Sequence, residues 1–131
     1  MASLSEKLGD MTYDNLIAGL NPKKRVGAAT IAGPAADTTF MRGTVFAKST
    51  STGKLSILGT TAAENDTMTP DCILCDDVTV KKTTDINVPV YLAGLFNIDA
   101  VAVKAGYTMT EADKDKLRER GIAFTGVSDA E

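Results

Sequence analysis

Apolar and polar side chains alternate most regularly between residues 86 and 103. The even positions from Ile86 to Ala100 are all apolar or glycine, and the odd positions begin with Asn87 and Pro89. A period of two predicts β-structure with the even side chains facing inward. One strand of this length would span roughly 55 Å at about 3.3 Å per residue. We therefore expect Gly94 to break or bulge it, giving two strands.

A second pattern predicts a β-hairpin. Two apolar runs, residues 44–47 and 55–58, flank a polar loop that is rich in Ser and Thr and contains Gly53. Strand-forming runs on either side of a turn-rich segment are typical of a hairpin. Gly43 precedes the first run, and we expect both glycines to take the positive φ that turns require.

Shorter apolar runs predict further strands. Residues 71–75 and 78–80 are two of them, and Pro70 bounds the polar connection that precedes the first. Residues 26–32 favour a strand or an extended segment of small side chains, which suits the edge of another sheet. Residues 122–124 are expected to return as a short strand or as part of the core.

The pattern of residues 108–120 predicts an α-helix, the one that we expect in this chain. Thr108 and Glu111 fit a capping box. Acidic residues come early and basic residues late, which complements the helix dipole. Gly121 follows in the position of a C-terminal cap. The sequence thus indicates a mainly β fold with one C-terminal α-helix.

The first 25 residues differ from the rest of the chain. Besides Met1, six large aliphatic or methionine side chains lie there among polar residues and interrupting Gly and Pro, and Lys23, Lys24 and Arg25 form a basic cluster at the end. One interpretation is a solvated tail. The other is an arm that becomes ordered on a partner, because disordered tails seldom carry so many large apolar residues. We therefore divide the chain into an N-terminal arm, residues 1–25, and a β-rich domain, residues 26–131.

Composition narrows the possible functions. The chain has 131 residues, a net charge of −3 and no histidine. One domain is the simplest organisation, and the charge does not favour general nucleic-acid binding. No apolar run is long enough to span a bilayer, and no signal peptide is evident. Without histidine the chain lacks the commonest general base and metal ligand, so we expect neither an enzyme nor a cofactor.

Cys72 and Cys75 form the one CxxC motif. In a strand, residues three apart point to opposite faces, and a zinc site would need two further ligands. We expect two buried structural thiols. The segment 51–54 ends like a phosphate-binding loop but lacks the earlier glycine and the following helix, so we interpret it as a turn.

The order and spacing of several short motifs resemble the lambda-type head decoration proteins of tailed bacteriophages. The motifs are Met41-Arg42-Gly43-Thr44-Val45, Thr52-Gly53-Lys54, the strand Val88–Phe96, and Arg120-Gly121-Ile122. The resemblance covers residues 26–125 approximately, and the first 25 residues match less well.

The resemblance implies a small body of the β-clip or β-barrel type that forms homotrimers. Such trimers would be made in the host cytoplasm and would sit on the outer surface of the virion. They would bind the major capsid protein of the expanded head at three-fold and quasi-three-fold positions and stabilise the shell against packed DNA. It also implies an N-terminal arm that is disordered in the free protein and adds to a β-element of the capsid, with no direct contact to nucleic acid or membrane.

The resemblance gives the N-terminal arm a role, and the candidate residues themselves come from the sequence pattern. Those expected to form the capsid-binding arm are Leu16, Ile17, Leu20, Lys23, Lys24, Arg25, Val26 and Ile31. Those expected at structural turns are Gly43, Gly53, Gly94 and Gly121. Three arms on one trimer would bind with avidity, and strand addition would supply backbone hydrogen bonds.

Two other functions stay open at this point. One is a capsid-borne adhesion module that recognises a host surface, which the scarcity of aromatic residues disfavours. The other is a small redox or metal protein built on Cys72 and Cys75, which thiol reactivity in the native state would favour.

Overall fold

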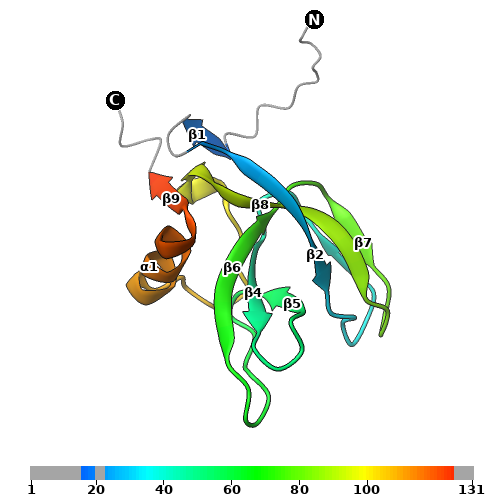
Figure 1. Cartoon of the computed structure of the whole chain (residues 1–131). Coiled ribbons are helices and arrows are strands. Elements are labelled where there is room, and N and C mark those ends of the chain that lie inside the picture. The colour runs from blue at the N-terminus through cyan, green and yellow to red at the C-terminus, as the bar shows by residue number, and fades with distance from the viewer. Residues whose placement is uncertain (1–15, 20–22, 126–131) are drawn as a thin grey trace, which may run out of the picture.

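The computed structural model describes residues 16–19 and 23–125 (Figure 1). Its strands are β1 (Ile17–Gly19), β2 (Arg25–Ile31), β3 (Thr38–Phe40), β4 (Val45–Ser49), β5 (Leu55–Ile57), β6 (Met68–Leu74), β7 (Val78–Val80), β8 (Ile86–Asn97) and β9 (Ile122–Thr125). The helical elements are a 3₁₀ turn, η1 (Ile98–Ala100), and one α-helix, α1 (Glu111–Arg120). The prediction of a mainly β fold with a helix near the C-terminus is confirmed.

Five strands form a closed ring. The hydrogen-bonded order is β8, β2, β5, β4 and β6, and β6 pairs again with β8. All these pairs are antiparallel except β2 with β5, which is parallel and joins Ile31 to Leu55. The body is therefore a small barrel, and closure of this kind leaves no long open edge among the five strands. A separate two-stranded sheet joins β3 to β7.

Strand β8 belongs to two layers at once. Its first part pairs with β2 and β6 in the barrel, and its last part pairs with β1 and β9 outside the barrel. The expected break at Gly94 is wrong, because β8 continues through it by changing partners. The register with β2 shifts earlier, where Arg25 pairs with Ala93 and Val26 with Tyr91.

Two apolar cores lie on opposite sides of the barrel wall. The barrel core contains Ile31, Phe46, Leu55, Cys72, Leu74, Val80, Val88 and Val90. The outer core lies between the barrel wall and the layer of β1, β9 and α1, and contains Leu16, Val45, Ala47, Leu58, Ile73, Cys75, Tyr91, Phe96, Leu117 and Ile122. Neighbours in one strand divide between the two cores because successive side chains point to opposite faces. The even positions Val88 and Val90 face the barrel core, as expected.

The hairpin of β4 and β5 is found where the sequence predicts it, with Phe46 paired to Ile57. Gly43 and Gly53 have φ values of +98° and +73°. Pro70 does not bound the preceding connection but lies inside β6, opposite Ala47, where the register with β4 shifts. A proline has no backbone N–H to donate, and it fits there because the bulge interrupts the hydrogen bonds between the two strands.

Helix α1 begins later than expected. Thr110, not Thr108, is the N-cap: its side chain accepts a hydrogen bond from the backbone N–H of Asp113, and the Asp113 carboxylate accepts one from the N–H of Thr110. Tyr107 donates a further hydrogen bond to the same carboxylate. This bond favours a cap at Thr110, two residues after the position that the sequence predicted. Gly121 ends the helix with φ +104°. Within the described residues, no helix is both long and apolar enough to cross a membrane.

Candidate functional site

The described chain begins at Leu16, which is a core residue. Its side chain is 1% exposed, and its carbonyl accepts a hydrogen bond of 2.8 Å from the N–H of Asn97. The next residue, Ile17, pairs with Phe96 in β1 and packs against the outer core. Leu16 and Ile17, which the sequence assigned to a partner-binding arm, are therefore attached to the body.

The glycine at position 43 lies against the backbone of Ala100 and beside Leu16. A Cβ atom at Gly43 would lie 2.9 Å from the carbonyl oxygen of Ala100 and 3.4 Å from Leu16 Cδ1. The positive φ of Gly43 disfavours other residues as well. The loop before β4 and the first described residues are thus built to approach each other.

Four of the predicted arm residues are exposed. Lys23, Lys24 and Arg25 lie on the surface where β2 begins, and Val26 is 57% exposed. Leu20 lies outside the described residues. The exposed cluster therefore consists of three basic side chains and one apolar side chain, which we call the β2 cluster.

The rest of β2 does not lie along the edge of a foreign sheet. From Arg25 to Ile31 it pairs with β8 of its own barrel, and Ile31 is 1% exposed in the barrel core. The small side chains serve this packing, because a Cβ atom at Gly27 would lie 2.5 Å from Leu92 Cδ1. The expectation that Ile31 contacts a capsid is not met in this conformation.

Arg42 ties the loop before β4 to the barrel wall. Its Nη1 donates hydrogen bonds of 2.6 Å to the Tyr91 hydroxyl and 3.1 Å to the Cys75 carbonyl. Its guanidinium carbon lies 5.5 Å from the centre of the Tyr91 ring, and its backbone N–H donates to Asp77. Sequence reasoning missed this role because it depends on residues more than 30 positions away.

Arg120 joins α1 to β6. Its Nη2 lies 2.7 Å from Asp71 Oδ1, and its Nε donates a 3.1 Å hydrogen bond to the Asp71 carbonyl. The Asp71 side chain is only 7% exposed. A charge this well buried needs a partner, and the end of the helix supplies it.

The two thiols are buried, as predicted, and they lie in different cores. Burial raises the pKa of Cys72 far above its usual value, and the neighbouring Asp71 raises it further. Burial also raises the pKa of Cys75 to about 11. Because the thiolate is the reactive form, this environment does not suit redox or metal chemistry.

The polar loop between β4 and β5 is fastened by Asp66. The carboxylate accepts hydrogen bonds from the hydroxyls of Ser49 and Thr50 and from the backbone N–H groups of Ser51 and Thr67, at 2.6 to 3.1 Å. These bonds hold the pKa of Asp66 at about 2. The loop is thus a braced turn, and it is followed by a strand and not by the helix of a phosphate-binding loop.

The exposed parts of the described surface are the candidates for binding a partner. Over residues 16–19 and 23–125, no group of three potential metal-ligating side chains comes together. Among the features above, the exposed β2 cluster is the one with both charge and apolar surface available to a partner.

Comparison with known proteins adds the identity of the family. No curated protein gives a significant match. A family model described as bacteriophage lambda head decoration protein D matches residues 7–123. The match includes most of the N-terminal segment as well as the barrel, β8, α1 and the start of β9. The chain therefore belongs to the bacteriophage lambda head decoration protein D family.

Proposed function

We propose that this protein binds the outer surface of the expanded phage head as a homotrimer, at three-fold and quasi-three-fold positions. There it bridges neighbouring subunits of the major capsid protein and stabilises the shell against packed DNA. The observation that carries the proposal is the family match over residues 7–123, which spans both the N-terminal segment and the body.

In this proposal the folded body and the N-terminal segment have different roles. The barrel and the outer layer form a closed body that is fastened by Arg42, Asp66 and Arg120. The segment that precedes Leu16 carries Leu4, Leu8 and Met11. We propose that residues 1–15 form the partner-binding part of the arm, with Leu16 and Ile17 as its anchor on the body.

The β2 cluster is the second part of the proposed contact. Lys23, Lys24 and Arg25 are exposed beside the anchor, and their charge suits an acidic surface on the shell. Leu20 and Val26 would add apolar contacts. Three arms on one trimer give avidity, so each arm needs only a weak contact for the whole to bind tightly.

The proposal is tested by co-sedimentation of the purified protein with expanded and unexpanded shells of the same phage. We expect binding to expanded shells at three copies per occupied site and much weaker binding to unexpanded ones. Stabilisation is measured as a higher temperature of shell disruption after the protein is added. Equal binding to both shells, or none to either, would contradict the proposed function.

The redox alternative has lost its support, because both thiols are buried and their pKa values are raised. No observation on the described surface favours host adhesion over capsid binding.

A further inference from the structure

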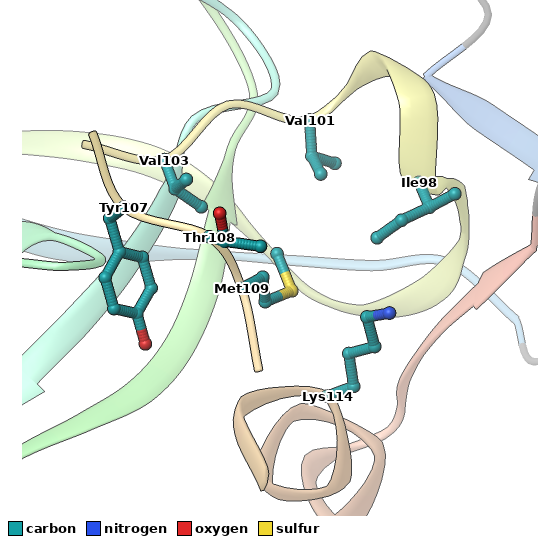
Figure 2. A pocket seen from close by; sticks show the side chains of 7 residues that line it. All are labelled: Ile98, Val101, Val103, Tyr107, Thr108, Met109 and Lys114. Atoms are coloured by element: carbon teal, nitrogen blue, oxygen red, sulfur yellow. The ribbon is translucent and has the colours of Figure 1, made fainter. Parts of the chain in front are cut away.

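A hollow of about 320 Å³ lies between η1, the connection after it and α1 (Figure 2). Its walls are formed by Ile98, Val101, Val103 and Met109, all of which are half-buried. Three of these four side chains, those of Val101, Val103 and Met109, also pack against the outer core. We call this hollow the η1–α1 groove.

The groove combines an apolar floor with one cation. Of the described residues that line it, Lys114 alone carries a charge, and Figure 2 shows its side chain extending from α1 toward Ile98. Its ion pair with Glu111 measures 3.2 Å, but the Glu111 side chain is 87% exposed. Exposed pairs of this kind contribute little, so Lys114 can share its charge with an incoming carboxylate. The complementary ligand has a large apolar side chain next to an acidic group.

The walls of the groove are fixed before any partner arrives. Tyr107 donates a hydrogen bond to Asp113, and Thr110 caps α1 through the same residue. Leu117 anchors the helix in the outer core at 0% exposure. A preformed site of this kind binds without an ordering cost on its own side.

The groove adjoins the place where the described chain begins. The N–H of Asn97 donates to the carbonyl of Leu16, and the residue after Asn97 is Ile98, a wall of the groove. The antiparallel pairing of β1 with β8 means that the chain enters the body at this end of β8. The groove therefore lies next to the point where the described chain begins.

We propose that the η1–α1 groove is a second docking point for the major capsid protein, and that it takes an apolar side chain and an adjacent carboxylate from that protein. This inference rests on the proposed function, since it names the part of the rigid body that contacts the same shell. The arm supplies reach, while the groove sets the orientation of the body on the shell.

The groove is tested by filling it. Thr108 is exposed and lines the groove, so Thr108→Trp places a large ring there, whereas Ala105→Trp adds the same ring to an exposed position of the same connection that does not line the groove. We expect Thr108→Trp to weaken co-sedimentation with expanded shells by about tenfold or more, because a trimer loses three contacts together. Ala105→Trp should bind as the wild type does.

The cation is tested on the same helix. Lys114→Met keeps the apolar stem and removes the ammonium, and Lys116→Met does the same at an exposed position outside the groove. We expect about threefold weaker binding and a smaller salt dependence for Lys114→Met only. This pair keeps the inference falsifiable if Thr108→Trp does not fold, as judged by circular dichroism and melting.

A photo-crosslinking amino acid at position 108 identifies the occupant. Cross-links from bound protein to an apolar–acidic segment of the major capsid protein support the proposal. Cross-links to residues 1–15 or to a second copy, or a changed sedimentation coefficient of free Thr108→Trp, overturn it. Undiminished binding by both groove variants, or equal loss in both controls, overturns the groove alone. A wild type that binds no shell overturns the proposed function and the groove together.

Discussion

The guanidinium of Arg120, the last residue of α1, lies 2.7 Å from the carboxylate of Asp71 at the bulge of β6. The pair connects the outer layer to the barrel across 49 residues of sequence. Asp71 is nearly buried and Arg120 is 45% exposed, so the partner on the helix can be removed without opening a cavity in either core.

Removing that partner should destabilise the fold. Arg120→Met leaves the Asp71 carboxylate buried without its cation, and we expect a loss of roughly 1–3 kcal/mol in the free energy of unfolding. The control is Arg118→Met, which breaks an exposed pair with Asp115 and should cost less than about 1 kcal/mol. Denaturant titration measures both. Equal losses would show that the buried pair with Asp71 contributes no more to the free energy of unfolding than the exposed pair with Asp115.

The two hairpin glycines should respond differently to substitution. A Cβ atom at Gly53 meets nothing within 4 Å, whereas one at Gly43 would lie 2.9 Å from a backbone oxygen. Both have positive φ, so Gly53→Val should cost roughly 1–2 kcal/mol from backbone strain alone. Gly43→Val adds the steric clash and should cost roughly 3 kcal/mol or more. Melting curves measure both variants, and a smaller effect at Gly43 would contradict the close approach of Gly43 to the Ala100 carbonyl.

The thiols should be protected in the native state. We expect a thiol reagent at pH 8 to label neither Cys72 nor Cys75 rapidly until denaturant is added, because both are buried and protonated. Folding raises the pKa values of both thiols, so the protonated thiols favour the folded state. This contribution to the free energy of unfolding is complete below the unfolded pKa of about 8.5 and is lost as the pH rises above that value. The Cys72→Ala/Cys75→Ala protein should therefore show a shallower fall in stability between pH 8.5 and the folded pKa of Cys75, about 11. Fast labelling of the folded wild type would refute the burial.

Asp66 has the opposite pH dependence. Its pKa is lowered to about 2 by four hydrogen bonds, so the stability it contributes is present above the unfolded value of about 3.9 and is lost as the pH falls toward 2. Asp66→Asn should flatten the acid limb of the stability curve and speed amide exchange at Ser51 and Thr67. Asp76→Asn, in the turn between β6 and β7, serves as the control. An NMR titration of Asp66 with an ordinary pKa would contradict the braced loop.

Truncation should separate the arm from its anchor. Deleting residues 1–15 should leave the melting temperature unchanged and abolish most binding to expanded shells. Deleting residues 1–25 also removes Leu16 and Ile17, and the loss of a buried leucine alone costs about 2–5 kcal/mol. Replacing Lys23, Lys24 and Arg25 by Ser should mainly lower the salt sensitivity of binding.

Circular dichroism and co-sedimentation with expanded shells measure these variants side by side. If the protein that lacks residues 1–15 folds and binds fully, the contact does not lie in that segment. If the protein that lacks residues 1–25 is as stable as the wild type, Leu16 is not the anchor that its burial indicates.

Local patterns were enough to predict much of the fold. The alternation after Ile86 marks a strand with an inward even face, and the two runs around Gly53 mark a hairpin, because each depends on neighbours in sequence. The closing pair of the barrel could not be predicted in this way. Ile73 meets Tyr91, and nothing near either residue in the sequence specifies the other.

The errors have the same origin. Leu16 was assigned to the arm because its neighbours in sequence show no regular period, and the residues that bury its side chain, such as Val45 and Phe96, are distant in sequence. Thr108 and Thr110 both precede an acidic residue at the capping distance, and the hydrogen bond from Tyr107 to Asp113 favours the second. The groove was missed because the alternation after Ile86 predicted β-structure as far as residue 103, whereas β8 ends at Asn97 and Val101 and Val103 lie in the connection that follows η1. Lys114 comes from α1, and no local pattern links that helix to this connection.

The wall shared by the two cores determines how the molecule can come apart. Strands β4, β6 and β8 each give side chains to both cores, at Val45 and Phe46, Ile73 and Leu74, and Val90 and Tyr91. The loss of any one of these strands would remove side chains from both cores, so we expect the body to unfold as one cooperative unit. Proteolysis within the body should then require the unfolding of both cores together.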